Sequence, residues 1–192
     1  MTALTLNLHS AIELTDERFE QICHSNRDLR FERTSTGELV VMSPAGSDTG
    51  KQNSGLNGQL WLWNQQTRLG VTFDSSAGFT LPNGAIRSPD ASWIKQERWD
   101  SLNVSQKRKF APICPDFVVE LCSPSDRLTD VQTKMQEYLD NGAILGWLID
   151  PETRTVEIYR PNQTVEVKNA PNSLLGEDIL PGFKLDLQEI WG

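Results

Sequence analysis

The sequence predicts one α/β (α+β) domain over residues 1–192, in which a mixed sheet carries helices on its faces. The chain has 192 residues, a length that suits one domain. Its composition, with 38% hydrophobic and 23% charged residues, is typical of a globular protein. An apolar run, a helical pattern and a second apolar run succeed one another over residues 117–149, which indicates a strand–helix–strand unit.

The first half of the chain is predicted to contain two helices and several strands. A helix near residues 15–24 is expected because Thr15 can accept a hydrogen bond from the first helical turn. A longer helix over residues 51–68 is indicated by an apolar stripe that includes Leu56, and Gly70 is expected to end it. Extended segments are predicted at residues 29–33, 38–42, 71–73, 78–81 and 89–94.

The second half is predicted to alternate strands and helices. Thr129 and Gln132 have the spacing of a capping box, and Gly142 is placed to end the helix that they would begin. The predicted segments are a polar and partly helical stretch at 96–109, strands at 117–122, 144–149 and 155–159, a helix at 130–141, and short strands or coil over 161–192.

Charge and cysteine content restrict the class of protein. The net charge of −8 argues against non-specific coating of nucleic acid, which depends on surplus lysine and arginine. No segment approaches the roughly 18 apolar residues of a membrane span, and the N-terminus lacks the pattern of a secretory signal. The three cysteines are an odd number without CxxC spacing, so we expect reduced thiols and a cytoplasmic protein.

Two charged residues stand at positions that should face the interior. Alternation along the predicted strand places Glu120 on one face with Val118 and Cys122, inside an apolar run. A buried carboxylate needs a cation or hydrogen-bond donors, although a structural ion pair or a strand end that reaches water would also satisfy it. Lys134 follows Val131 by three residues, so the helix directs it toward the sheet unless it snorkels to the surface.

A metal site would need a further acid, and Asp90 and Asp116 both follow prolines. Asp116 and Glu120 are four residues apart on one strand, a span of about 13 Å that one ion cannot bridge. Asp90 lies on another extended segment, and paired strands are only about 4.8 Å apart. We therefore prefer Asp90, and we interpret Asp116 as a residue of the strand entry.

Two carboxylates and a lysine are suited to the hydrolysis of a phosphodiester. Carboxylate oxygens bind Mg²⁺ or Mn²⁺, and such an ion activates water and offsets the charge of a phosphate. The lysine can orient the attacking water or stabilise charge in the transition state.

The order of these residues resembles the PD-(D/E)xK nuclease superfamily, and longer motifs resemble the Uma-two family of bacterial restriction-endonuclease-like proteins. Each motif is weak alone, because short patterns of this kind occur by chance. Their order and spacing together are fairly specific, and they cover most of the chain. The motifs are GELVVMSP (37–44), SPDASWI (88–94), PDFVVELCSPSD (115–126), KMQEYLDNGAILGWLIDP (134–151) and VEIYRP (156–161).

The resemblance implies a restriction-endonuclease-like fold, a divalent metal, DNA endonuclease activity and a homodimer. It also implies that Asp90 and Glu120 ligate the metal together with the backbone carbonyl of Leu121. A second acid sometimes assists on the N-terminal side in this superfamily. Glu32 is the preferred position for it, and Glu38 is the alternative.

One position departs from the superfamily pattern. Cys122 stands where the catalytic lysine is usual, two residues after the glutamate, and it supplies no positive charge. Some superfamily members carry the lysine on the following helix, which matches Lys134. If Lys134 does not take this role, the alternative is a catalytically inactive nuclease-fold protein that serves as a binding or regulatory module.

One compact basic cluster remains, formed by residues 107–109. It could contact a phosphate backbone, but a solvated loop or helix end is the preferred interpretation. The sequence contains neither a GxxxxGK[ST] phosphate loop nor a dinucleotide fingerprint, which argues against other common α/β enzymes.

Overall fold

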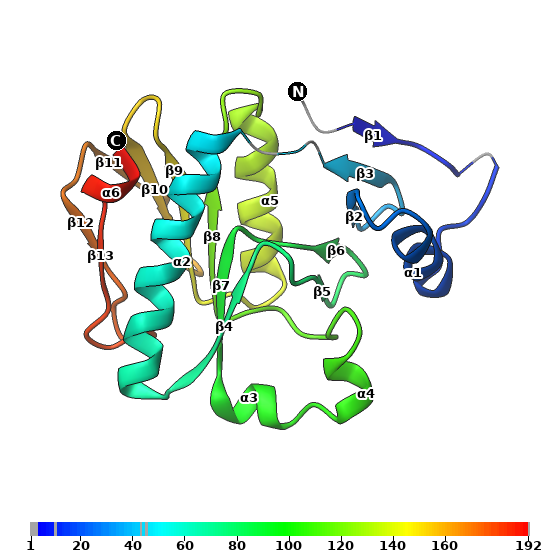
Figure 1. Cartoon of the computed structure of the whole chain (residues 1–192), viewed down its shortest axis with the longest axis horizontal. Helices are drawn as coiled ribbons and strands as arrows, with labels where there is room; N and C mark the ends of the chain where they lie inside the picture. Colours follow the sequence, from blue (N-terminus) through cyan, green and yellow to red (C-terminus); the bar gives the residue numbers. More distant parts are fainter. Residues whose placement is uncertain (1–3, 10, 43, 45, 192) are drawn as a thin grey trace.

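The computed structural model of the chain describes residues 4–9, 11–42, 44 and 46–191 (Figure 1). Its helices are α1 (Asp16–Ser25), α2 (Ser47–Thr67), α3 (Gln96–Asp100), α4 (Val104–Lys107), α5 (Leu128–Asp140) and α6 (Gln188–Trp191). Its strands are β1 (Leu4–Leu6), β2 (Arg30–Arg33), β3 (Leu39–Met42), β4 (Gly70–Asp74), β5 (Phe79–Thr80), β6 (Ile86–Arg87), β7 (Ala91–Lys95), β8 (Phe117–Leu121), β9 (Leu145–Asp150), β10 (Thr155–Tyr159), β11 (Glu166–Asn169), β12 (Ser173–Leu175) and β13 (Lys184–Asp186).

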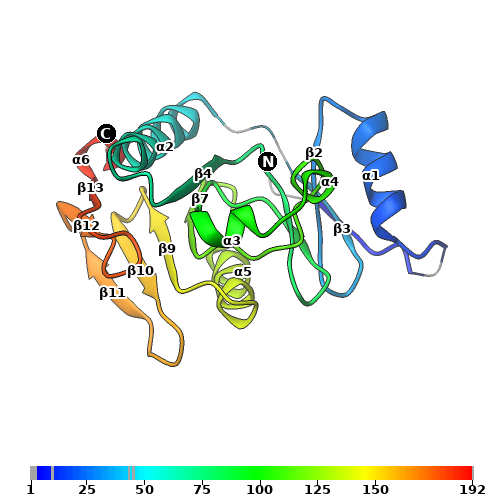
Figure 2. The ribbon, with the colours of Figure 1, turned by 90° about the horizontal axis from the view of Figure 1, so that it is seen from below.

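A six-stranded mixed sheet forms the centre of the fold, with the strand order β11-β10-β9-β8-β7-β4. The pairing of β8 with β9 is parallel, as the strand–helix–strand unit through α5 predicts, and the remaining pairings are antiparallel. Helices α2 and α5 lie on opposite sides of this sheet (Figure 2). The predicted fold class, a mixed sheet flanked by helices, is therefore confirmed.

The two faces of β8 belong to two separate layers of the core. Phe117, Val119 and Leu121 pack in the cluster that α2 covers. Val118 points the other way and packs in the cluster to which α5 contributes Met135. Glu120 shares this second face by alternation, so the fold directs its carboxylate toward α5.

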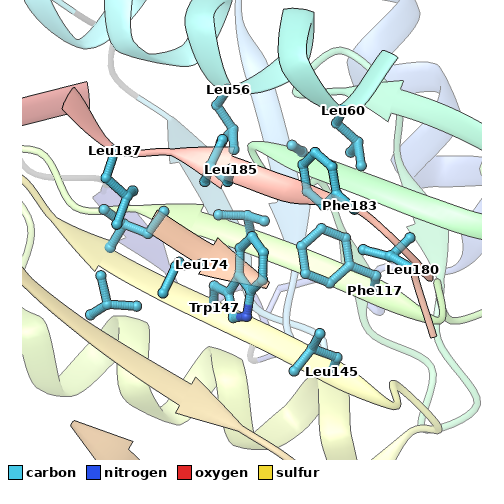
Figure 3. Packing of buried hydrophobic residues seen from close by; sticks show 14 of the residues in the cluster. Leu56, Leu60, Phe117, Leu145, Trp147, Leu174, Leu180, Phe183, Leu185 and Leu187 are labelled. Atoms are coloured by element: carbon cyan, nitrogen blue, oxygen red, sulfur yellow. The ribbon is translucent and has the colours of Figure 1, made fainter. Parts of the chain in front are cut away.

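The core on the α2 side is the larger of these two layers. Figure 3 shows Leu56 and Leu60 of α2 above Phe117 and Trp147, whose rings meet edge to face with centroids 4.8 Å apart. The two-stranded sheet β12-β13 and its connection close the same layer with apolar side chains. These are Leu174, Leu180, Phe183, Leu185 and Leu187.

A separate five-stranded sheet, in the order β1-β3-β2-β6-β5, lies beside the central sheet. Helix α1 packs on it through Phe19, which joins Phe31 and Ile86 in a third hydrophobic cluster. This sheet matters for the candidate site because β2 carries Glu32 and β6 carries Arg87.

Two predicted helix boundaries were wrong. No capping box forms at Thr129 and Gln132, because α5 begins earlier, after Arg127, and Gln132 donates instead to Glu157 on β10. Gly70 does not end α2 either. Arg68 ends that helix in the left-handed conformation, with φ of 54°, whereas Gly70 begins β4.

The other differences from the sequence prediction are smaller. Helix α2 begins at Ser47, four residues before the predicted start, and α6 occupies a segment expected to be strand or coil. The predicted cap is confirmed, because the Thr15 hydroxyl accepts from the backbone of Arg18. Gly142 has φ of 110° and follows α5 as predicted. Among the helices described, none is long and apolar enough to cross a bilayer.

A glycine substitution tests the close contact between β4 and β7. A Cβ atom at Gly70 would collide with the carbonyl oxygen of Ile94 and the ring of Trp93. We expect Gly70→Ala to lower the free energy of unfolding by about 1–3 kcal/mol, the usual cost of overpacking. The matched control is Gly58→Ala in the middle of α2, where a Cβ would meet open space.

Gly58→Ala should raise the free energy of unfolding by about 0.5–1 kcal/mol, because alanine loses less backbone entropy in a helix. Urea unfolding of both variants gives the two values. Equal effects of the two substitutions would contradict the close contact at Gly70.

Candidate active site

Glu120 lies on the α5 face of the central sheet, and its side chain is 9% exposed. Its Oε1 atom accepts from the Lys134 ammonium at 2.9 Å and from the Tyr138 hydroxyl at 3.0 Å. Both donors come from α5, where they are four residues apart and therefore share one helix face. The buried carboxylate thus has a cation and a neutral donor on the same helix.

Lys134 stands between two carboxylates from different sheets. Its Nζ atom lies 2.8 Å from Glu32 on β2 and 2.9 Å from Glu120 on β8. The side chain is only 12% exposed, so the alternative of a snorkelling lysine does not hold. The Lys134 side chain points inward because it lies on the same helical stripe as Val131 and Met135, which pack in the core.

Arg87 extends this ion-pair chain. It lies 3.1 Å from Glu32 through Nη1 and 2.6 Å from Glu137 through Nε. Glu32 also accepts from the backbone N–H of Ser88 at 2.9 Å. The Glu32 carboxylate thus contacts Arg87 of β6, the backbone of Ser88 and Lys134 of α5. These contacts tie the five-stranded sheet to the helix that packs on the central sheet.

Asp90 lies directly before β7, beside the end of β8. Ala91 pairs with Val119 in the antiparallel register, so Asp90 falls opposite Glu120 when the register continues by one step. The Asp90 Oδ2 atom accepts from the backbone N–H of Leu121 at 2.8 Å. The structure thus places Asp90 next to the strand that pairs with the strand of Glu120.

Two asparagines of α2 hold Asp90 in place, and sequence reasoning did not identify them. Asn53 donates to the Asp90 carboxylate at 2.9 Å, and Asn57 donates to the Asp90 backbone oxygen at 2.9 Å. Both asparagines lie in the middle of a helix, where asparagine is unfavourable, and they are four residues apart. This pattern is the sequence signal that could have revealed them. The Oδ1 atom of Asn53 is buried without a hydrogen-bond partner among the described residues.

The site holds more negative than positive charge. Burial raises the pKa of Glu120 to about 8, and the charges of Asp90 and Glu32 add to this effect against the opposing charge of Lys134. Burial also raises the pKa of Asp90, although the hydrogen bonds from Asn53 and Leu121 lower it. The charged groups of the cluster are the carboxylates of Glu32, Asp90, Glu120 and Glu137 and the cations of Lys134 and Arg87.

The ion pairs of the cluster shift the pKa values of Glu32 and Lys134 in opposite directions. Burial alone would raise the pKa of Glu32, but Lys134 and Arg87 hold it below its ordinary value. Burial would lower the pKa of Lys134, but Glu120 and Glu32 raise it, so the ammonium stays charged at neutral pH. Asp90 and Glu120 are therefore the acids whose ionised forms are least compensated, and their raised pKa values favour the protonated forms unless a further cation lies beside them.

This donor set fits Mg²⁺ or Mn²⁺. Asp90 and Glu120 supply carboxylate oxygens, which both ions prefer, and the surplus negative charge favours a divalent cation there. The described residues contain no cluster of three or more Asp, Glu, His or Cys side chains able to hold a metal ion. Two carboxylates with backbone and water oxygens would complete the coordination, since Mg²⁺ keeps several waters. The roles of Leu121 and Glu32 as ligands stay predictions.

Asp116 and Glu38 have partners outside the candidate site, and Cys122 is uncharged. Asp116 accepts from Arg98 at 2.7 Å and from the backbone of Lys95 at 2.8 Å, which fixes the entry to β8. Glu38 accepts from Thr34 and Thr36 in the turn before β3. Burial raises the pKa of the Cys122 thiol to about 12, so this side chain is neutral.

Replacement of Lys134 tests how strongly the two buried carboxylates depend on it. We expect Lys134→Met to lower the free energy of unfolding by about 3–5 kcal/mol, because Glu32 and Glu120 would lose a buried partner. Lys95→Met is the control, since Lys95 pairs with Glu97 at the surface, where both side chains are more than half exposed. Urea unfolding should show a far smaller change for Lys95→Met, and equal losses would contradict the burial of the Lys134 pairs.

A solved structure is similar to this chain. The crystal structure of "a putative nuclease belonging to DUF820" from Anabaena variabilis ATCC 29413 superposes with a TM-score of 0.70 at 23% sequence identity. The similarity covers 84% of this chain and 89% of the other, and at this identity it shows the shared fold. No curated protein matches the sequence.

The sequence also matches a family model, that of Uma2, which is described as "Putative restriction endonuclease". The match extends over residues 16–188 and so includes the ion-pair chain, Asp90 and the whole of the central sheet. It confirms the resemblance carried by the sequence motifs. The chain belongs to the Uma2 family of restriction-endonuclease-like proteins.

Proposed function

We propose that this protein is a metal-dependent DNA endonuclease. The observation that carries the proposal is the buried arrangement in which the Lys134 ammonium contacts Glu120 beside Asp90, at the end of two paired strands. Membership of the Uma2 family supports the same reaction. DNA is the substrate that the family description implies, and hydrolysis of a phosphodiester is the chemistry that the side chains suit.

Each residue has a distinct task in the proposed reaction. Asp90 and Glu120 would hold Mg²⁺ or Mn²⁺, and the ion would activate water for attack and offset charge on the phosphate. Asn53 and Leu121 fix the Asp90 carboxylate through one hydrogen bond to each oxygen. Tyr138 fixes Glu120 in the same way, so little reorganisation is needed when substrate arrives.

Lys134 acts as a fixed cation. Its raised pKa keeps the ammonium protonated at neutral pH, so it is unsuited to be a general base. Two of its three N–H groups have the carboxylates of Glu32 and Glu120 as partners, which leaves one to donate to the attacking water or to a phosphate oxygen. The ammonium thus supplies the positive charge that Cys122, at the usual lysine position, does not supply.

The resemblance to the family also leads us to propose a homodimer in the cytoplasm. Cys23, Cys114 and Cys122 are free thiols, which is usual for proteins of a reducing compartment. The edge strand β1 exposes Leu4 and Leu6, which is compatible with a contact to a second copy.

Cleavage of plasmid DNA tests the proposed activity. We expect the wild-type protein to cleave with Mg²⁺ or Mn²⁺ and to be inactive in a chelator. Glu120→Gln and Asp90→Asn should each reduce the rate by about 10²–10³-fold, the usual loss when a group that stabilises transition-state charge is removed. Glu97→Gln, at an exposed ion pair, is the control that should keep full activity. Undiminished cleavage by Glu120→Gln would refute the assignment.

Calorimetric titration with Mn²⁺ separates an enzyme from an inactive relative. The wild-type protein should bind Mn²⁺, whereas Asp90→Asn should bind it at least about tenfold more weakly because one ligand loses its charge. Binding without cleavage would favour the binding or regulatory module over the nuclease. Absence of any Mn²⁺ binding would overturn the proposed metal site.

A further inference from the structure

An open surface cavity of about 680 Å³ lies apart from the candidate active site. It is lined by the last turn of α1, the turn between β4 and β5, Trp99 of α3, and the segment that ends α4. In Figure 1, α1 and α4 lie on the right of the molecule and α3 lies at its lower edge. Neither Asp90, Glu120 nor Lys134 lines it, so it is a separate site, which we call the basic cavity.

Positive charge gathers around the basic cavity, although the chain as a whole carries a net charge of −8. Four cationic side chains line it, those of Arg27, Lys107, Arg108 and Lys109. Among its lining residues the carboxylate is that of Glu20, which already pairs with Lys109 at 2.9 Å. Within the described part of the chain, Arg27 and Arg108 have no carboxylate partner. Arg27 contacts the His24 ring through Nη2 at 3.1 Å, which leaves its other N–H groups and the guanidinium of Arg108 available to an anion.

Aromatic side chains form the apolar part of the same cavity. Trp99 is half-buried, and the Lys107 ammonium lies 5.2 Å from the centre of its ring. Phe73 meets Trp99 edge to face, with ring centroids 5.0 Å apart, and Phe110 lines the cavity from the segment after α4. A ligand held by the arginines would thus also meet flat apolar surfaces.

We propose that the basic cavity binds a nucleoside phosphate. Arginine forks match phosphate oxygens in a bidentate manner, and aromatic side chains stack on bases. A volume of 680 Å³ lies within the range of small-molecule sites, which is about 300–1,000 Å³. It is larger than a bare phosphate needs. Arg27 and Arg108 bind the phosphate, and Trp99 with Phe110 contacts the base.

The ligand has two possible sources, a free nucleotide or a nucleotide within a DNA strand. Phe73 also lines a neighbouring groove of about 590 Å³, to which Asn53 contributes. Asn53 also donates to Asp90, so this groove shares one residue with the surroundings of Asp90 and another, Phe73, with the basic cavity. The inference rests on the proposed function only if the ligand is a nucleotide within a DNA strand. Binding itself does not depend on cleavage.

Calorimetric titrations of the full chain in EDTA test the proposal without any contribution from metal or cleavage. The probes are a 5′-phosphorylated thymidine dinucleotide, a single-stranded oligothymidylate of about twelve nucleotides, and inorganic phosphate. Arg27→Ala and Arg108→Ala are the test variants. Both arginines are exposed, so their truncation should leave the thermal unfolding midpoint unchanged. Lys184→Ala removes one positive charge from an exposed position of β13, at the other side of the molecule (Figure 1).

We expect each arginine variant to bind the dinucleotide about tenfold more weakly, whereas Lys184→Ala stays within about twofold of the wild type. Inorganic phosphate should bind at least about tenfold more weakly than the dinucleotide, because it lacks the base. Tighter binding of the oligonucleotide than of the dinucleotide identifies a strand as the source, and equal binding identifies a free nucleotide.

The proposal is overturned if neither nucleotide probe binds, if both arginine variants bind like the wild type, or if phosphate binds as tightly as the dinucleotide. These outcomes leave the metal-dependent cleavage test unaffected, since Asp90 and Glu120 take no part in them. A failed cleavage assay likewise leaves the titrations in EDTA unchanged.

Discussion

The double ion pair of Lys134 with Glu32 and Glu120 is the interaction on which the rest of the site depends. It places one ammonium between carboxylates from two different sheets, with almost no exposure to water. Charges buried in this way are tolerated only when each has a partner. The fold meets this requirement because α5 contacts residues of both sheets, with Arg87 as a second cation beside Glu32.

The same cluster explains why the site is suited to a divalent cation. Lys134 and Arg87 together hold the pKa of Glu32 below its ordinary value, whereas Lys134 offsets the burial of Glu120 only in part, so the pKa values of Asp90 and Glu120 stay raised. These two acids lie where β7 pairs with β8, since Asp90 directly precedes β7 and Glu120 belongs to β8. The asparagines of α2 hold one acid from one side of the sheet, and α5 holds the other acid from the opposite side.

Periodic patterns in the sequence were sufficient to predict the central features. Alternation along residues 117–122 and the stripe of the following helix placed Glu120 and Lys134 on facing surfaces, because both patterns are local. The contact between Arg87 and Glu32 joins residues 55 positions apart, and no local pattern encodes it. Local signals also failed where tertiary partners competed. Gln132 binds Glu157 on β10 instead of capping its helix, and Gly70 is required by Trp93 rather than by the end of α2.

The most direct test of the account is the location of Mn²⁺ in crystals soaked with the ion, read from its anomalous scattering. The account predicts a peak in contact with carboxylate oxygens of both Asp90 and Glu120, with the Lys134 ammonium beside it. A peak elsewhere, or none at these two residues, would contradict the assignment of the buried cluster as a metal-dependent active site.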